Sequence, residues 1–473
     1  MNNSEPSSAL IEGVGLSGPN SDFSPAGLWN RRYRRVAAAS KTLDVRIALS
    51  RADGICFHHD ISLLQPEQDP GGLNFIFLER TLKFLLWQRG GSRVHISGCD
   101  PLTAQLSRIY SASGPRSFDA DFFGRKVYGS PLSIQACRAE ALPPARDEPV
   151  LLGGHLDGCR IGFDLGGSDR KCAALIDGKL VFSEEIPWDP YFQKDPQYHL
   201  HGIQDSLERA AAHLPRVDAI GGSAAGVYVQ NQVRVASLFR GIPETDFDLH
   251  VRDLFLHLKR RWNHIPFEVV NDGEVTALAG AVALGEGPVL GISMGTSLAA
   301  GYCDREGRIT SWLNELAFAP VDYAAEAPVD EWSGDRGCGV QYFSQQGVAR
   351  LAREAGYAFP EDMPLAERLV AVQTDAEDGN PRALGIFDAV GRAFGHALAH
   401  YADFYDLRHV LVLGRVTSGC GGTRILEAAR KILAEAYPDL HETLHLSMPD
   451  EKMKRHGQAV AAASLPALSG ESL

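Results

Sequence analysis

Two glycine-rich segments of this chain repeat each other without a gap. Residues 162–168 read Gly-Phe-Asp-Leu-Gly-Gly-Ser, and residues 291–297 read Gly-Ile-Ser-Met-Gly-Thr-Ser. Apolar residues and then a glycine-containing turn follow each copy, which predicts strand, tight turn, strand, turn and strand. Glycine lets the backbone approach a bound group closely, and the amides of such turns can surround phosphate oxygens. The repeat therefore predicts two phosphate-binding hairpins, one in each half of a duplicated structure, as in a phosphotransferase.

The two copies differ at one chemically important position. Asp164 in the first copy corresponds to Ser293 in the second. A carboxylate beside phosphate groups suits a hydrated magnesium ion. The hydroxyls of Ser293, Thr296 and Ser297 can instead donate hydrogen bonds to phosphate oxygens without adding negative charge. The alternative is that both segments are ordinary hairpins with polar turns.

Asp272 is the strongest candidate for a catalytic base. It follows an apolar strand pattern at 267–270 and opens an alanine-rich helical pattern. A carboxylate at this junction lies near positive backbone amides, which keep it ionised, so it can accept a proton from an attacking hydroxyl. Aspartate is also a common helix N-cap, and the residues alone leave the two interpretations open.

Composition argues against several classes of protein. The chain has 473 residues, 44% of them hydrophobic and 22% charged, which suits a globular enzyme of two or three domains. Its net charge of -13 argues against sequence-independent binding to nucleic acid. No apolar run is long enough to span a bilayer, and no secretory signal is visible. The 8 cysteines lie singly, so we expect a cytoplasmic protein with reduced thiols.

Changes in composition divide the chain into four parts. Residues 1–42, rich in Ser, Gly, Pro and Asn and then basic, are expected to be a flexible arm. Residues 43–149 are expected to form an accessory α/β unit that ends in a proline-containing linker. Residues 150–285 and 286–473 are expected to be the two duplicated lobes, because strand and helix patterns alternate there. Apolar spacing predicts helices over 73–87, 102–110, 206–214, 254–262, 273–284, 340–355, 383–405 and 421–436, and strands over 45–49, 55–59, 94–97, 219–221, 267–270 and 410–413.

Between residues 158 and 465 the chain resembles the ROK family of sugar kinases and repressors, within the actin-like ATPase superfamily. The resemblance implies an α/β fold, the duplicated two-lobed actin-like ATPase (ribonuclease H-like) fold, with an extra N-terminal α/β unit. It also implies ATP and magnesium as cofactors and a sugar-like small molecule as substrate. The segments that carry it follow the family's order: 164–171, 220–226, 270–272, 291–297 and 411–414 with 419–422.

The repeat and the resemblance together assign a candidate site. Asp272 would be the general base, and Asp164 would hold magnesium. The substrate would contact Asn271, Gly226 and Glu315. The nucleotide would be held by Asp164, Gly166, Gly167, Ser168, Lys171, Gly295, Thr296, Ser297, Gly414 and Gly419.

The chain departs from the family pattern at the residues that bind zinc in that family. Phe318 stands where the family has a histidine, Cys338 alone remains of a cysteine cluster, and Val340 replaces a glutamate. A structural zinc ion needs about four ligands, so the sequence predicts a branch without zinc. Specificity for glucose does not follow from the resemblance.

Two functions agree with these features: an ATP-dependent carbohydrate kinase, or a non-catalytic sugar sensor or transcriptional regulator. Repressors of the family carry an N-terminal winged helix-turn-helix, whereas residues 43–140 begin with paired strand patterns and show no helix with clustered Arg or Lys. Retention of both Asp164 and Asp272 favours the kinase. We expect no nucleic-acid or membrane partner. The accessory unit is expected to dock close to the first lobe, where it would complete the acceptor side or form a homodimer interface.

Overall fold

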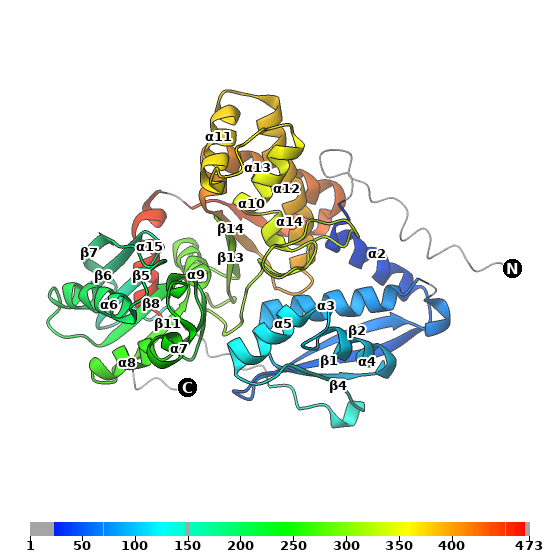
Figure 1. Ribbon diagram of the computed structural model, residues 1–473, viewed down its shortest axis with the longest axis horizontal. Helices are drawn as coiled ribbons and strands as arrows, with labels where there is room; N and C mark the ends of the chain where they lie inside the picture. Colours follow the sequence, from blue (N-terminus) through cyan, green and yellow to red (C-terminus); the bar gives the residue numbers. More distant parts are fainter. Residues whose placement is uncertain (1–22, 70, 147–151, 450, 469–473) are drawn as a thin grey trace.

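The computed structural model describes residues 23–69, 71–146, 152–449 and 451–468. Three sheets of four or five strands form two lobes and an N-terminal unit. In Figure 1 the first lobe lies on the left, the second lobe at the top and the N-terminal unit at the lower right. The predicted fold class, a duplicated α/β structure with an added N-terminal α/β unit, is confirmed.

The first lobe contains the strands β5 (Cys159–Leu165), β6 (Asp169–Ile176), β7 (Lys179–Pro187), β8 (Ala219–Ala224) and β11 (Phe267–Asn271). They form one sheet in the order β11-β8-β5-β6-β7. The strands β5, β6 and β7 make an antiparallel meander, while β8 and β11 run parallel to β5. This meander is the first copy of the repeat, with the strand-turn-strand-turn-strand order that the sequence predicts.

The second lobe contains the strands β12 (Val289–Met294), β13 (Leu298–Cys303), β14 (His409–Leu413) and β15 (His445–Ser447). Their order, β13-β12-β14-β15, repeats the first sheet with one strand fewer. The third strand predicted for the second copy does not form, since Ile309 makes only isolated bridges, to Cys303 and Leu152. The residues after it turn toward the N-terminal unit, where the N–H of Asn314 donates to the carbonyl of Gln88.

Helices cover the two sheets and link the lobes to each other. They are α6 (Pro196–Ala211), α7 (Glu244–Asp246), α8 (Leu254–Arg261), α9 (Asp272–Leu284), α10 (Gln345–Glu354), α11 (Leu365–Glu377), α12 (Pro381–Tyr401), α13 (Cys420–Ala436), α14 (Pro438–Thr443) and α15 (Glu451–Ala463). Although α9 follows the first sheet, it packs on β13, where a Cβ on Gly301 would overlap the backbone of Gly273. The last helix, α15, returns to the first sheet, and Gly162 and Gly221 leave room for its backbone. Helices α9 and α15 therefore join the two lobes across the predicted boundary at 285.

The N-terminal unit is a four-stranded sheet with helices on it. It contains β1 (Thr42–Ser50), β2 (Cys56–Leu64), β3 (Arg93–Ser97), β4 (Ser133–Ala136), α3 (Leu73–Arg89), α4 (Asp100–Ile109), α5 (Ser117–Asp121) and a π-helical turn (Phe122–Tyr128). The sheet order is β2-β1-β3-β4, and β1 pairs with β2 in antiparallel register. The predicted strand pair and both predicted helices are confirmed.

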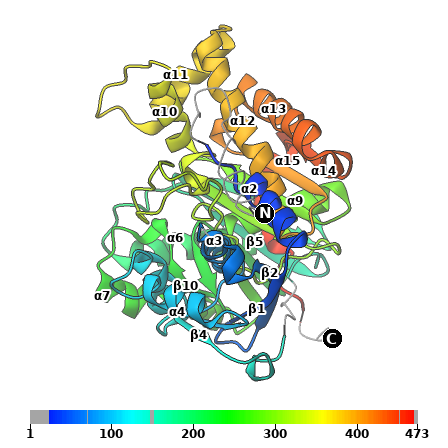
Figure 2. The same cartoon turned by 90° about the vertical axis from the view of Figure 1, so that its right-hand side faces the viewer.

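Part of the expected flexible arm is folded. Helix α2 (Ala26–Ala38) packs on α12, as Figure 2 shows, and Tyr33 is fully buried. Two arginines of this helix contact α12 and its surroundings: Arg34 forms an ion pair of 2.8 Å with Asp403, and Arg31 lies over the ring of Tyr437. The prediction was wrong for residues 23–42 because aromatic and alanine side chains at helical spacing offset the polar composition. Residues 1–22 lie outside the described residues.

The N-terminal unit packs mainly on the second lobe and not, as predicted, on the first. Helix α3 is buried on nearly all sides. Its Phe84 stacks on Phe404 with ring centroids 4.1 Å apart, and its Trp87 lies 4.7 Å from Phe318. A smaller contact joins the π-helical turn to the first lobe at β10 (Gln232–Val235), which pairs with β9 (Val227–Val229). None of the helices in the described part of the chain is long and apolar enough to cross a membrane.

Candidate active site

The candidate residues of the first lobe gather at one edge of its sheet. Because β5, β8 and β11 are parallel, their carboxyl ends lie at the same edge of the sheet. Asp164 is the second-last residue of β5, Gly226 lies just beyond β8, and Asp272 directly follows β11. The side chain of Asn271 connects two of these ends: its Nδ2 donates to the carbonyl of Gly226 at 2.7 Å, and its Oδ1 accepts from the N–H of Gly273 at 2.7 Å. The structure therefore brings together residues that are far apart in the sequence.

Asp272 is the first residue of α9, and it is not the cap of that helix. Asn271 fills the N-cap position, so the N-cap interpretation left open by the sequence is wrong for Asp272. The half-buried Asp272 carboxylate also accepts from the N–H of Gly273, at 3.0 Å. Burial raises the pKa of Asp272, and the backbone amides at the helix start oppose this rise. The backbone amides at the start of α9 therefore hold the Asp272 carboxylate in place.

Asp164 lies beside Asp272 and is almost completely buried. Burial raises the pKa of Asp164 to about 6, and the charge of Asp272 adds to the rise. The Ser223 hydroxyl and the Lys171 ammonium group act in the opposite direction. Both are register partners of Asp164, on β8 and β6 respectively. Lys171 also forms an ion pair of 3.4 Å with Asp169.

The first glycine turn is supported from behind by a tryptophan. The N–H of Gly166 donates to the carbonyl of Asp169 at 2.9 Å, which closes the turn. The indole Nε1 of Trp188 donates to the carbonyl of Gly166 at 2.8 Å. A Cβ on Gly167 would overlap the Tyr191 hydroxyl, so a larger residue there would require the Tyr191 side chain to move. Ser168 is exposed at the tip of the turn, where its hydroxyl donates to Asp169 at 2.9 Å.

The second glycine turn, in the second lobe, is more open. The N–H of Gly295 donates to the carbonyl of Ser297 at 2.9 Å, and its carbonyl accepts from the N–H of Gln345 at 2.9 Å. The atom nearest to a Cβ built on Gly295 belongs to the turn itself, the Ser297 carbonyl oxygen at 3.6 Å. Thr296 and Ser297 are exposed. The turn therefore presents a glycine and two hydroxyl residues to open space.

Two of the predicted glycines precede α13, and one of them lies beside this turn. Gly414 has φ +105° and a Cβ there would overlap the backbone of Met294, directly before Gly295. Gly419 has φ +63° and a Cβ would overlap the Glu377 carboxylate, which accepts from the N–H of Cys420 at 2.6 Å. Gly414 is thus joined to the second glycine turn, while Gly419 faces α11.

Glu315 lies close to Asp272, together with a glutamate that the sequence analysis missed. Burial and the charge of Asp272 raise the pKa of Glu315 to about 8. The buried Glu274, in the first turn of α9, has a pKa raised to about 8 by burial and Glu315, and it accepts from Asn314 Nδ2 at 3.2 Å. The signal for Glu274 was its charge inside an otherwise apolar helix.

The side chains at the positions that differ from the family pattern are packed in the core. Phe318 packs against Trp87, Phe118 and Trp332. Val340 is buried, and the Cys338 Sγ is buried 3.8 Å from the Asp335 carboxylate. Within the described residues no group of three or more His, Cys, Asp and Glu side chains is arranged to hold a metal ion. The absence of zinc remains a prediction.

No protein-family model matches this sequence, and no curated protein matches it either. The structure does resemble solved structures. One is a ROK hexokinase from Thermus thermophilus, 20% identical, with a TM-score of 0.51 over 64% of this chain and 96% of the hexokinase. Another is a ROK family transcriptional regulator, described as a homologue of the E. coli MLC protein, 18% identical, with a TM-score of 0.51 over 66% of this chain and 78% of the regulator. The chain therefore has the two-lobed fold of ROK proteins, which both a kinase and a regulator adopt.

Proposed function

We propose that this protein belongs to the ROK family and is an ATP-dependent carbohydrate kinase, which transfers phosphate to a hydroxyl of a sugar or sugar-like polyol. The position of Asp272 carries the proposal. It begins α9 without capping it, and it interacts electrostatically with both Asp164 and Glu315. A carboxylate between a candidate magnesium ligand and a candidate acceptor ligand suits a general base.

The residues present fit magnesium and a nucleotide. Asp164 is a buried oxygen ligand of the kind that magnesium prefers, and its raised pKa reflects a carboxylate whose charge the protein only partly compensates. Magnesium would neutralise charge on the phosphate oxygens. Lys171 would add a positive charge beside Asp164. The phosphate chain would be held by Gly166, Gly167, Ser168, Gly295, Thr296 and Ser297, and Gly414 and Gly419 would border the adenosine.

The acceptor would lie between Asp272 and Glu315. The Asp272 carboxylate would take the proton of the acceptor hydroxyl as that oxygen attacks the γ-phosphate. Glu315 would bind other hydroxyls of the acceptor, and its raised pKa allows it to donate as well as to accept. Asn271, whose amide already bonds Gly226 and Gly273, would serve to hold these neighbours in position.

A sugar sensor is the second candidate, and the regulator with the same fold favours it. The described part of the N-terminal unit is a sheet with helices and not a winged helix-turn-helix, so we propose no contact with DNA. A sensor would bind a sugar and transfer no phosphate.

Phosphate transfer from ATP with magnesium tests the proposal. We expect acceptor-dependent release of ADP with at least one of glucose, mannose, glucosamine, fructose and sorbitol. Binding of one of these sugars in calorimetry without any phosphorylated product would favour the sensor. If the protein neither binds nor phosphorylates any of them, both functions are contradicted.

A further inference from the structure

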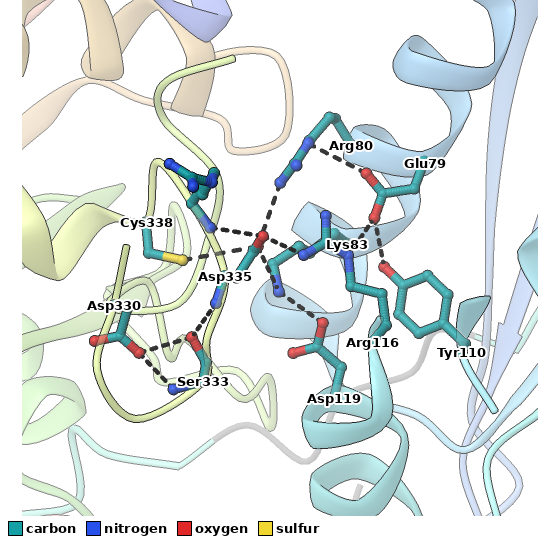
Figure 3. A network of polar contacts seen from close by, with 11 residues as sticks. Glu79, Arg80, Lys83, Tyr110, Arg116, Asp119, Asp330, Ser333, Asp335 and Cys338 are labelled. Atoms are coloured by element: carbon teal, nitrogen blue, oxygen red, sulfur yellow. Dashed lines mark hydrogen bonds and ion pairs between the residues drawn. The ribbon is translucent and has the colours of Figure 1, made fainter. Parts of the chain in front are cut away.

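A buried ion cluster joins the N-terminal unit to the second lobe. Its cations come from the N-terminal unit: Arg80 and Lys83 of α3, and Arg116 before α5. All three converge on Asp335 of the second lobe, as Figure 3 shows. Lys83 Nζ lies 3.0 Å from Asp335 and 2.6 Å from Asp119. The N-terminal unit thus holds a single carboxylate of the second lobe with three side chains.

The charges of this cluster fix the position of Asp335. Burial alone would raise the pKa of Asp335, but Lys83, Arg80 and Arg116 outweigh burial and hold it well below its usual range. Glu79 and Asp119 balance the cations, with Glu79 2.9 Å from Arg116. A buried carboxylate with this many ionic partners has one favourable position, since moving it would leave charges unpaired.

Asp335 in turn lies in a loop that is bonded to the segment after Glu315. The carbonyl of Gly337 accepts from the N–H of Val321 at 2.8 Å. The N–H of Gly339 donates to Ala319 at 3.0 Å, and that of Val340 donates to Ala317 at 2.9 Å. Fixing Asp335 therefore fixes the backbone that follows Glu315.

The carboxyl end of α3 holds Glu315 directly. The N–H of Glu315 donates to the carbonyl of Trp87, and the N–H of Asn314 donates to the carbonyl of Gln88, both at 3.0 Å. These carbonyls belong to the last turn of α3, where helix carbonyls have no partner within the helix. Asn314 has φ +52°, and its Oδ1 accepts from the Tyr405 hydroxyl at 2.8 Å.

We propose that α3 positions the acceptor-binding side of the active site, with Lys83, Arg80 and Arg116 as positioning residues for Glu315. The N-terminal unit thereby sets acceptor affinity without touching the nucleotide. This inference rests on the proposed function, because it assumes that Glu315 binds the acceptor. The unit would be a required part of the site and not an attached module.

The test replaces one charge pair of the cluster by near-isosteres, in the full chain. In Lys83→Met with Asp119→Asn, Asp335 keeps Arg80 and Arg116. We expect KM for the best acceptor of the panel to rise about 10-fold or more, with KM for ATP and the calorimetric affinity for ATP unchanged and kcat lowered less than about 3-fold. The matched control is Arg46→Met with Asp60→Asn, an exposed ion pair of the same unit, which should change nothing. A merely structural role would lower the active fraction and leave KM unchanged.

A second, milder variant keeps the inference testable if the double variant does not fold. Arg80→Gln removes one cation from Asp335, and we expect a rise in acceptor KM of about 3-fold. An unchanged acceptor KM in every folded variant, with wild-type phosphorylation intact, overturns the inference and leaves the proposed function standing. A wild-type protein that neither binds nor phosphorylates any sugar of the panel overturns both.

Discussion

At the scale of single residues, Asn271 and Asp272 divide two tasks that one aspartate could have combined. Asn271 caps α9, which leaves the neighbouring carboxylate free of that structural duty. The negative charge of Asp272 then raises the pKa of both Asp164 and Glu315. Carboxylates with raised pKa values that gather in one place cost stability, and such clusters are frequent at functional sites.

Replacing Asp272 by Asn should lower phosphate transfer by roughly 100-fold or more, because the amide cannot take the acceptor proton. Its size and its hydrogen bond to the Gly273 amide are kept, so the affinity for ATP should change little. Steady-state kinetics and calorimetry measure the two effects. Asp100→Asn, at the exposed first residue of α4, is the matched control. Undiminished activity in Asp272→Asn would remove this residue from the mechanism.

Replacing Glu274 by Gln should change how stability depends on pH. Burial raises the pKa of Glu274 from its usual 4.5 to about 8, so the folded state keeps a proton that the unfolded chain releases. The contribution of Glu274 to wild-type stability should therefore be lost as pH rises from about 4.5 to 8, and it should not change above that range. One pKa unit corresponds to about 1.4 kcal/mol, so the variant should gain a few kcal/mol relative to wild type between pH 5 and 8.5.

Denaturant unfolding at pH 5 and pH 8.5 measures this difference. Glu306→Gln, which changes an exposed glutamate, is the control and should show no such gain. If the difference in unfolding free energy between Glu274→Gln and wild type is the same at both pH values, Glu274 is not protonated in the folded protein.

The purified protein should contain no stoichiometric zinc. Phe318 and Val340 are packed in the core, and Cys338 lies beside Asp335, which is already engaged by three cations. The remaining thiol cannot supply the roughly four ligands that a structural zinc ion needs. Elemental analysis of protein purified without chelators checks this. One zinc per chain would show that other residues supply the ligands.

At the scale of elements, the two glycine turns have the same origin in a hairpin but different surroundings. The first is closed in by Trp188 and Tyr191, and the second is open around Gly295. Open space around a glycine with ordinary backbone angles means that the fold does not need glycine there. The open space beside Gly295 is where the proposed phosphate cradle would hold a bound group.

Gly295→Val should therefore fold normally and lose nucleotide affinity, by about 10-fold or more, because the branched side chain occupies the space proposed for phosphate. Calorimetric titration with ATP measures the loss, and thermal unfolding checks the fold. Gly385→Val, on α12 with equally open surroundings, is the control that should bind ATP normally. Unaltered ATP binding in Gly295→Val would refute the cradle.

At the scale of the whole molecule, the N-terminal unit and the second lobe share one hydrophobic core. The core cluster runs from Phe23 and Tyr33 through α3 to α12 and α13 without interruption. The first lobe has its own core, and it is joined to the second lobe by α9 and α15. The N-terminal unit is thus part of the folding unit of the second lobe.

A chain that begins at residue 148 should accordingly be insoluble or aggregated. Loss of the N-terminal unit would expose Phe404, Phe318 and the α12 surface that α2 and α3 cover. Exposed apolar surface promotes aggregation. Size-exclusion chromatography of the shortened protein beside the full chain measures this. A soluble, active, shortened protein would contradict the shared core and the positioning role of α3 alike.

The sequence by itself predicted the elements whose signals are local. Glycine turns, strand runs and helical spacing depend on neighbouring residues, so the first hairpin, α3, α9 and α12 lie close to their predicted ranges. The order of the phosphate-turn motifs and the resemblance built on them predicted the fold class. The carboxylates Asp164, Asp272 and Glu315 were chosen from the same patterns, and the structure places them in one neighbourhood.

Only the tertiary structure decided what depends on distant partners. The missing third strand near Ile309, the folded helix α2 and the docking of α3 on the second lobe all result from contacts between segments hundreds of residues apart, such as Arg51 with Ser311. The candidacy of Glu274 depends on its contacts with Asn314 and Glu315, which lie about 40 residues away in the sequence. Burial and charge are shared properties of residues from several segments, so no local pattern contains them.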